Sequence, residues 1–419
     1  MTSISARTSY DVVVVGGGAA GVAAAVSAAR TGASVCLVER YGFLGGAATN
    51  SSVLAYCGFF DQSREQVVRG IGQDFLDELE RQELLTLETS PATGNTIVVL
   101  DMETTKTVLD QLVRDAGVDV LFHSTLVAAD TDNERISAVH IAHRGGTLRL
   151  SASAFVDCSG DGALLEAAGA EFQLSPVERR QASTLVMRVG GVGEDADLST
   201  EAMDTAFAAY GQATGEVLTR SNGTCVRMPR SRELMLLLAD AYVDVLDVHQ
   251  LSRAELDGRA RARHYLNALK AGMPGWSGAY LASTGPQIGI REARRMLGRE
   301  SVSADDVLSA RRRPQDGIAR CGWPMEYHST PGATEYSGIR DRKWYDIPYG
   351  AVTSANITNL WGAGRLTSSD SRSFASLRVM GTSFATGHAA GLAASLHSSA
   401  GSVDLPKLRG LLQDQGALL

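Results

Sequence analysis

The stretch Asp11-Val-Val-Val-Val-Gly16-Gly-Gly18-Ala-Ala-Gly21 decides the fold of this chain. Its run of valines predicts a short strand buried in a parallel sheet, because unbroken β-branched runs favour that position. The alanine-rich residues that follow predict a helix to about Thr31, and residues 34–38 predict a second strand that ends at Glu39. The sequence therefore predicts a complete strand–helix–strand unit at the start of the chain.

Three glycines in this stretch have the spacing of a dinucleotide-binding turn. Gly16 permits the tight turn, Gly18 lets a pyrophosphate approach the backbone, and Gly21 lets the helix and strand pack closely. The phosphates would then lie at the positive N-terminus of the helix. Glu39 ends the second strand, where a carboxylate can accept hydrogen bonds from ribose hydroxyls. This unit alone does not distinguish FAD from NAD.

Four further motifs follow in a fixed order. Residues 41–50 read YGFLGGAATN, residues 157–162 read DCSGDG, residues 359–365 read NLWGAGR and residues 376–391 read SLRVMGTSFATGHAAG. With these motifs the chain resembles the FAD-dependent oxidoreductase family with a glutathione-reductase-like FAD-binding fold. More narrowly, it resembles the branch with GGxAT, DxSGDG and C-terminal GAGR…LRVM…ATGxAAG motifs. The resemblance implies FAD as the cofactor.

The order of the motifs also predicts the domain organisation. The resemblance implies an α/β fold in which a Rossmann-like FAD-binding domain of the glutathione-reductase type carries an inserted α+β substrate domain. Because cofactor motifs occupy both ends of the chain, we expect residues 1–168 and 341–419 to form the FAD-binding domain. Residues 169–340 would form the substrate or cap domain.

The less regular parts of the chain give coarser expectations. In the middle region, residues 185–189 are predicted to form a strand, and residues 230–241 and 253–271 are predicted to be helical. Residues 376–396, rich in glycine and alanine, are predicted to form one helix. The N-terminus of that last helix is expected to point at the flavin pyrimidine, since a helix N-terminus stabilises the negative charge of reduced flavin.

The resemblance and the motifs together predict the residues that contact FAD. They are Gly16, Gly18, Ala19, Ala20, Gly21, Glu39, Arg40, Gly45, Gly46, Ala47, Thr49, Leu126, Ser159, Gly160, Asp161, Gly362, Gly364, Arg365, Arg378, Met380 and Gly381.

The candidates for catalysis and substrate binding lie outside the glycine-rich motifs. His328 is the first candidate for a catalytic base, since the resemblance places a histidine near the substrate face of the flavin; a structural histidine is the alternative. Cys57 and Tyr56 follow the GGAATN segment and are candidates for the substrate pocket, or simply for the core. Arg188 and Arg291 could bind a substrate carboxylate with a bidentate fork, or lie between domains.

The expected reaction follows from what the chain lacks. Outside the first unit, no second GxGxxG motif with flanking strands is found, which disfavours a separate NAD(P)H-binding domain. We therefore expect dehydrogenation of a small organic metabolite by hydride transfer to flavin N5. An NAD(P)H-dependent reductase or monooxygenase is the second hypothesis, and a flavin-binding scaffold or electron-transfer partner is the third.

Composition restricts the partners and the compartment. The net charge of −8 gives no support to a nucleic-acid partner, and the 5 cysteines form no CxxC pair, so neither a metal site nor a disulfide framework is expected. The first ten residues lack an apolar signal core, and the most apolar stretch is interrupted by glycines, so neither a signal peptide nor a membrane span is expected. We expect a cytoplasmic protein with a small-molecule substrate; a homodimer is an open alternative.

Overall fold

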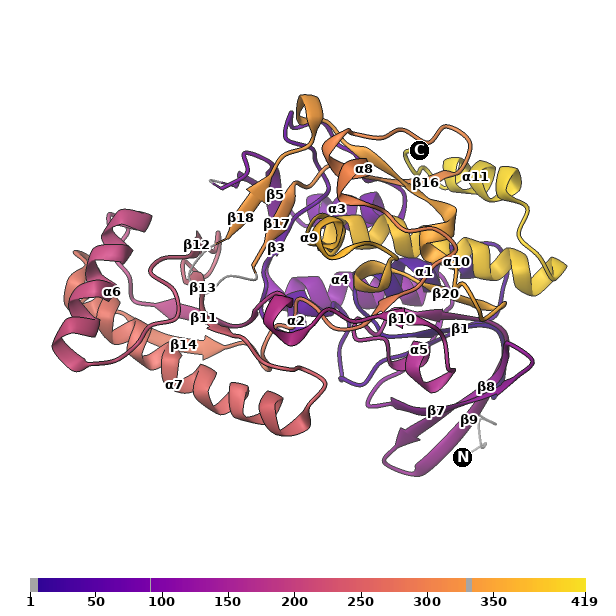
Figure 1. The fold of residues 1–419 in the computed structure, drawn as a ribbon, viewed down its shortest axis with the longest axis horizontal. Helices are drawn as coiled ribbons and strands as arrows, with labels where there is room; N and C mark the ends of the chain where they lie inside the picture. The colour runs from indigo at the N-terminus through magenta and orange to yellow at the C-terminus, as the bar shows by residue number, and fades with distance from the viewer. Residues whose placement is uncertain (1–6, 91, 329–333) are drawn as a thin grey trace.

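A seven-stranded sheet forms the centre of the larger part of the molecule (Figure 1). The computed structural model describes residues 7–90, 92–328 and 334–419. The sheet has the order β6-β2-β1-β9-β8-β7, and β20 also pairs with β9. Its strands are β1 (Ser9–Val15), β2 (Val35–Val38), β6 (Asp119–Leu121), β7 (Thr125–Asp132), β8 (Arg135–His143), β9 (Gly146–Asp157) and β20 (Leu360–Gly362).

The pairing confirms the α/β fold class predicted from the sequence. Strands β6, β2, β1, β9 and β20 pair in parallel, as expected of a Rossmann-like unit, and β7 and β8 add an antiparallel hairpin arm. Because β20 lies near the end of the chain and pairs with β9, the C-terminal part completes the sheet begun by the N-terminal part.

Two helices of small residues pack directly against each other beside this sheet. They are α1 (Ala19–Ala29) and α10 (Met380–Ala400). A Cβ atom on Gly387 would lie 2.1 Å from the Ala20 carbonyl oxygen, and one on Gly391 would lie 2.1 Å from that of Ala24. The two helix backbones therefore touch, and glycine is required at both positions.

A four-stranded antiparallel sheet with two helices forms the smaller part, on the left in Figure 1. Its order is β12-β13-β11-β14, and helices α6 and α7 pack with it around a second hydrophobic core. The elements are β11 (Ser183–Gly190), α6 (Thr200–Thr214), β12 (Thr224–Arg227), β13 (Leu234–Ala241), α7 (Val248–Gly272) and β14 (Tyr280–Thr284).

The helix predicted for residues 230–241 is wrong. Residues 234–241 form the inner strand β13, which pairs with β12 on one side and β11 on the other. Leucine, methionine and alanine favour helices locally, but an unbroken apolar run also suits a strand that is buried on both faces. The predictions for residues 185–189 and 253–271 are confirmed by β11 and α7.

The second hydrophobic core covers a shorter segment of the chain than the inserted domain predicted for residues 169–340. It draws its buried residues from the segment between Leu185 and Ile288. Val302, Ile318 and Trp323 instead belong to the large core around α1 and α10. The packing therefore favours an inserted unit that ends well before residue 340.

The predicted single helix over residues 376–396 is wrong at its start. Helix α9 (Ser371–Leu377) ends, Val379 adopts an extended conformation with φ −72° and ψ 149°, and α10 begins at Met380. The Asp370 side chain caps the N-terminus of α9, and the Gly381 N–H donates to the Cys57 carbonyl oxygen, which directs the first turn of α10. The break leaves Arg378 in a turn between two helices.

The remaining elements connect these units. They are α2 (Ala47–Asn50), β3 (Ala55–Tyr56), α3 (Ile71–Arg81), β4 (Thr86–Thr89), β5 (Thr96–Val99), α4 (Met102–Asp115), α5 (Ala163–Ala167), β10 (Phe172–Gln173), β15 (Arg295–Met296), α8 (Ala304–Leu308), β16 (Gly317–Cys321), β17 (Met325–Tyr327), β18 (Glu335–Ser337), β19 (Tyr345–Pro348) and α11 (Leu405–Asp414).

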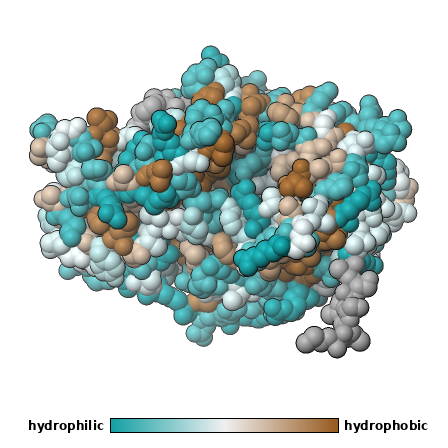
Figure 2. Space-filling view, turned by 90° about the horizontal axis from the view of Figure 1, so that it is seen from below, coloured by the Kyte–Doolittle hydropathy of each residue, from teal (hydrophilic) through white to brown (hydrophobic). Residues whose placement is uncertain are grey.

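The molecular surface is mixed in polarity. On the face in Figure 2, hydrophobic side chains form small groups among hydrophilic ones. Within the described ranges, no helix is both long and apolar enough to span a bilayer.

His388 on α10 gives a prediction for acid stability. Burial lowers the pKa of His388 to about 4, and its Nε2 lies 3.0 Å from Gln415 Oε1. Since the unfolded pKa is about 6.5, the unfolded state binds more protons between pH 6.5 and 4, and stability falls as the pH falls through that window. The free energy of unfolding of the wild type should therefore fall between pH 8 and pH 5. We expect this fall to be about 2 kcal/mol smaller in His388→Gln.

Urea unfolding at both pH values measures this difference. His249→Gln, at an exposed residue of α7, serves as the control and should leave the difference unchanged. An equal difference for wild type and His388→Gln would contradict the assignment.

Candidate active site

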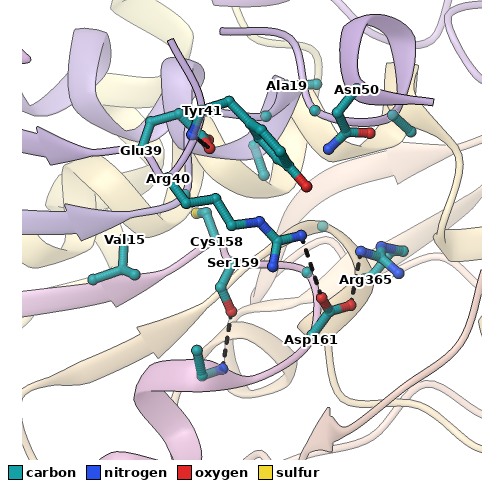
Figure 3. A pocket seen from close by; sticks show the side chains of 18 of the residues that line it. Val15, Ala19, Glu39, Arg40, Tyr41, Asn50, Cys158, Ser159, Asp161 and Arg365 are labelled. Carbon is teal, nitrogen blue, oxygen red and sulfur yellow. Dashed lines mark hydrogen bonds and ion pairs between the residues drawn. The ribbon is translucent and has the colours of Figure 1, made fainter. Parts of the chain in front are cut away.

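A cavity runs along the carboxyl ends of β1, β2 and β9, between the N-termini of α1 and α10 (Figure 3). Most of the residues predicted to contact FAD line it. They are Gly16, Gly18, Ala19, Ala20, Glu39, Arg40, Gly45, Gly46, Ala47, Leu126, Ser159, Gly160, Asp161, Gly364, Arg365, Arg378 and Met380. Ligands of open α/β sheets bind at this edge.

The three glycines of the turn at the start of α1 differ in what requires them. A Cβ on Gly16 would lie 2.4 Å from the Cys158 carbonyl oxygen, and one on Gly21 would lie 1.7 Å from that of Gly16. The fold itself therefore requires glycine at both positions. A Cβ on Gly18 would meet nothing closer than Gly46 Cα, at 3.5 Å. Since packing does not require glycine at 18, its place in the cavity wall fits the approach of a phosphate.

The first turn of α1 is open to an anion. Its N-cap residue, Gly18, has no side chain to accept from the helix N–H groups, and no acidic residue lies in the first turn. Such uncapped N–H groups, together with the helix dipole, bind phosphate. The residues present thus fit the pyrophosphate of FAD.

Glu39 is held in place by backbone donors. The Gly17 N–H donates to its Oε2 at 2.6 Å and the Tyr41 N–H donates to its Oε1 at 3.0 Å. Burial raises the pKa of Glu39, while these two hydrogen bonds act in the opposite direction. The carboxylate is thereby fixed at the cavity, where it can accept hydrogen bonds from ribose hydroxyls.

The opposite wall comes from the DCSGDG turn after β9. Asp157 is fully buried and accepts from the N–H groups of Ser159, Leu164 and Leu165, so it fixes the turn and the start of α5. Asp161 faces the cavity, where Arg365 Nη2 lies 3.1 Å from Oδ1 and Arg40 Nη2 lies 3.8 Å from Oδ2 (Figure 3). These two ion pairs join the N-terminal and C-terminal parts of the site.

The far end of the cavity is formed by Gly364, Arg378, Met380 and Ser383. The first turn of α10 has no side-chain cap and no acidic residue. Gly364 is in the left-handed region, at φ +65°, and donates its N–H to Thr386 Oγ1 at 3.0 Å. The first turn of α10 thus lines this end of the cavity, although its Gly381 N–H already donates to the Cys57 carbonyl oxygen. That this helix end points at the flavin stays a prediction.

Two titratable groups, the buried His328 and the half-buried Glu326, adjoin this end. His328 Nε2 lies 3.3 Å from Glu326 Oε1, and Arg378 Nη2 donates to the Glu326 carbonyl oxygen at 3.0 Å. Burial and the charge of Arg291 lower the pKa of His328 to about 4. Burial alone would raise the pKa of Glu326, but the hydrogen bond and charge of His328 and the charge of Arg378 hold it well below its usual range. At neutral pH the pair is thus a carboxylate and a neutral imidazole.

Some predicted residues do not line the cavity. Gly21, Thr49, Gly362 and Gly381 shape its walls from behind; a Cβ on Gly381, for example, would lie 2.6 Å from the Cys57 carbonyl oxygen. Their direct contact with FAD stays a prediction.

The predicted substrate-pocket residues are dispersed. Tyr56 is fully buried, and its ring packs against Phe75 and Phe384 with centroids 5.3 and 5.8 Å away, so it lies in the core. Arg188 pairs with Glu233 beside a separate small cavity. The structure therefore does not bring these two together.

Cys57 and Arg291 lie near the His328 end. Burial, then the charge of Glu326, raises the pKa of the half-buried Cys57 thiol, which is protonated at neutral pH. Arg291 Nη1 donates to the Ala182 carbonyl oxygen at 2.6 Å and to Thr184 Oγ1 at 2.5 Å, which leaves it engaged with the inserted unit.

Sequence reasoning missed several lining residues. They include Tyr41, Asn50, Ser51, Ser124, Gln287, Ile290 and Ser383. Tyr41 and Asn50 could have been found, because Tyr41 directly follows Arg40 and Asn50 directly follows the GGAAT motif. Gln287 and Ile290 carry no sequence signal, since only the folding of the inserted unit brings them to the cavity.

Comparison with solved structures finds the same fold. A geranylgeranyl bacteriochlorophyll reductase-like protein from Thermoplasma acidophilum aligns with a TM-score of 0.51 and 14% identity, over 97% of this chain and 84% of that chain. BexE, described in connection with oxidation during BE-7585A biosynthesis, aligns with a TM-score of 0.50 and 13% identity, over 97% and 66%. A search of the curated proteins found no match.

The family comparison agrees with the site. The sequence pattern of the family described as FAD dependent oxidoreductase matches residues 11–412. This range includes the α1 turn, Glu39, the DCSGDG turn and the start of α10, which are the parts that fit FAD. The chain therefore belongs to the FAD dependent oxidoreductase family.

Proposed function

We propose that this protein is a FAD-dependent dehydrogenase or oxidase of a small organic metabolite. The substrate would lie next to Arg378, which lines the cavity and donates to the Glu326 carbonyl oxygen. Glu326 and His328 lie behind Arg378 and do not line the cavity themselves. Flavin, when bound, supplies the hydride acceptor. The protein must then position the substrate and accept its proton.

The arrangement of His328 is the observation that carries this proposal. Since Nε2 lies beside the Glu326 carboxylate, its N–H can donate there, which leaves Nδ1 as the unprotonated atom. Thr334 Oγ1 lies 3.0 Å from Nδ1. In this tautomer Nδ1 accepts from the Thr334 hydroxyl, so the neutral imidazole can accept a substrate proton through that hydroxyl.

Glu326 is a positioning residue in this proposal. Trp323 Nε1 donates to its Oε2 at 3.2 Å, and the Tyr336 hydroxyl donates to its Oε1 at 3.3 Å. Three donors therefore fix the carboxylate, which selects the tautomer of His328 and stabilises the imidazolium once the proton arrives.

Anaerobic absorbance of the purified holoenzyme tests the direction of the reaction. We expect no bleaching of the flavin band with NADPH, and bleaching with one member of a panel of amines, alcohols and hydroxy acids. Rapid bleaching by NADPH alone would replace this proposal with an NAD(P)H-dependent reductase or monooxygenase.

His328→Gln gives a prediction for catalysis. We expect kcat for the identified substrate to fall about 100-fold, because a general base contributes 10²–10⁴-fold, while FAD content stays unchanged. In wild type, kcat should fall as the pH falls through about 4, where His328 gains a proton. His249→Gln is the matched control. Unchanged kcat in His328→Gln would assign His328 a purely structural role.

A further inference from the structure

The arginines near the far end of the cavity differ in the carboxylates that lie beside them. Arg365 is paired with Asp161 at 3.1 Å, and Arg291 has Asp240 at 3.9 Å. Arg378, in contrast, has no carboxylate oxygen within 4.0 Å in the part of the chain that the structure describes. It therefore has no close ion pair, although the nearby Glu326 carboxylate acts on it electrostatically.

Most of the hydrogen-bonding capacity of Arg378 is also unused. A guanidinium has five N–H donors. One Nη2 donor is used by the Glu326 carbonyl oxygen at 3.0 Å, while Nε is buried and has no partner among the described residues. Burial lowers the pKa of Arg378 to about 10, so the group remains charged at neutral pH although it is desolvated. A half-buried cation whose Nε is buried without a partner can bind an oxyanion.

A second unmet polar group lies next to His328. Gln181 is 4% exposed, and neither its amide nitrogen nor its amide oxygen has a partner within the described ranges. The adjacent Ala182 donates its N–H to the His328 carbonyl oxygen at 2.9 Å, and the Gln181 N–H donates to Glu292. Buried amides without partners are rare in proteins, so this one indicates a place for a polar ligand or water.

We propose that Arg378 binds a carboxylate group of the substrate, so that the enzyme acts on an organic acid. This inference rests on the proposed function and names its substrate class. The sequence had suggested Arg188 and Arg291 for this role. Arg188 instead pairs with Glu233 beside a separate cavity, and Arg291 donates to the Ala182 carbonyl oxygen and to Thr184 Oγ1 and does not line the FAD cavity. Arg378 lines the FAD cavity and contacts the backbone of Glu326, whose side chain lies beside His328, so an acid bound to Arg378 would lie at the side of the cavity nearest that pair.

Binding of simple acids to the oxidised holoenzyme tests this proposal without turnover. The probes are acetate and benzoate, with acetamide and benzamide as neutral isosteres, and the readout is the perturbation of the flavin absorbance bands. We expect the carboxylates to bind wild type and the amides to bind at least tenfold more weakly. Arg378→Met should weaken benzoate binding about 30-fold, and Arg378→Lys should weaken it less, because lysine keeps the charge but loses the fork.

Arg372→Met is the matched control, since Arg372 is exposed on α9 and does not line the cavity. It should bind benzoate as wild type does. Equal binding of benzoate and benzamide to wild type, or no binding of either, overturns the proposal even if Arg378→Met fails to hold FAD. If Arg378→Met leaves the affinity for benzoate unchanged but weakens the binding of sulfite to the flavin, the proposal is overturned. The charge of Arg378 would then stabilise the reduced flavin instead. None of these outcomes depends on whether the reaction is a dehydrogenation.

Discussion

Replacing Gly18 by alanine is expected to weaken FAD binding about 100-fold, or about 2.7 kcal/mol, and to leave the fold intact. The protein has room for the new methyl group, because the nearest protein atom would be Gly46 Cα at 3.5 Å. The backbone φ of −74° is also open to alanine. The methyl group would instead occupy space that the pyrophosphate needs in order to reach the N–H groups of α1, each of which contributes a charge-assisted hydrogen bond.

FAD titration of the apoprotein measures the effect, and thermal unfolding of the same apoprotein measures the fold. The control is Gly410→Ala on α11, where a Cβ meets nothing within 4 Å. It should bind FAD as wild type does. If Gly18→Ala binds FAD as tightly as Gly410→Ala, the phosphates do not lie at this turn.

Replacing Gly387 by alanine is expected to lower the free energy of unfolding by about 3 kcal/mol. Its Cβ would lie 2.1 Å from the Ala20 carbonyl oxygen and 2.7 Å from Ala20 Cα, which are backbone atoms that no side-chain rotation can move. Helices α1 and α10 would have to separate, and the start of α1 carries the phosphate turn. FAD affinity should therefore fall together with stability.

Urea unfolding of the apoprotein checks this value, and Gly410→Ala again provides the comparison. Since Gly410 is a helical glycine in open space, its replacement should stabilise the protein by about 0.5–1 kcal/mol. Equal unfolding midpoints for the two variants would mean that α1 and α10 do not touch as described.

The nucleotide end of the site could be predicted from the sequence because its contacts are local. Gly16, Gly18 and Glu39 lie within one strand–helix–strand unit, and their spacing fixes where each stands relative to the sheet edge. The DCSGDG turn follows a strand of the same sheet. Where contacts are this local, the residue spacing of the motif determines the geometry of the site.

The end of the cavity at Arg378 depends on contacts between distant segments and could not be predicted in the same way. The small residues of 376–396 suggest one helix, whereas the extended Val379 and the bond from the Gly381 N–H to the Cys57 carbonyl oxygen set its start at Met380. That break places Arg378 at the cavity. Likewise, the apolar run of β13 favours a helix when taken alone, and it forms a strand because β11 and β12 pair with it.

Titration of the apoprotein with FAD, FMN and NAD tests the central claim most directly. The cavity extends from Glu39, at the end of β2, to Met380, at the start of α10, so only a ligand with both an adenosine and a flavin part can use both ends. We predict one FAD per chain, bound at least about 100-fold more tightly than FMN or NAD. FMN or NAD bound as tightly as FAD, or no binding of FAD, would contradict the account.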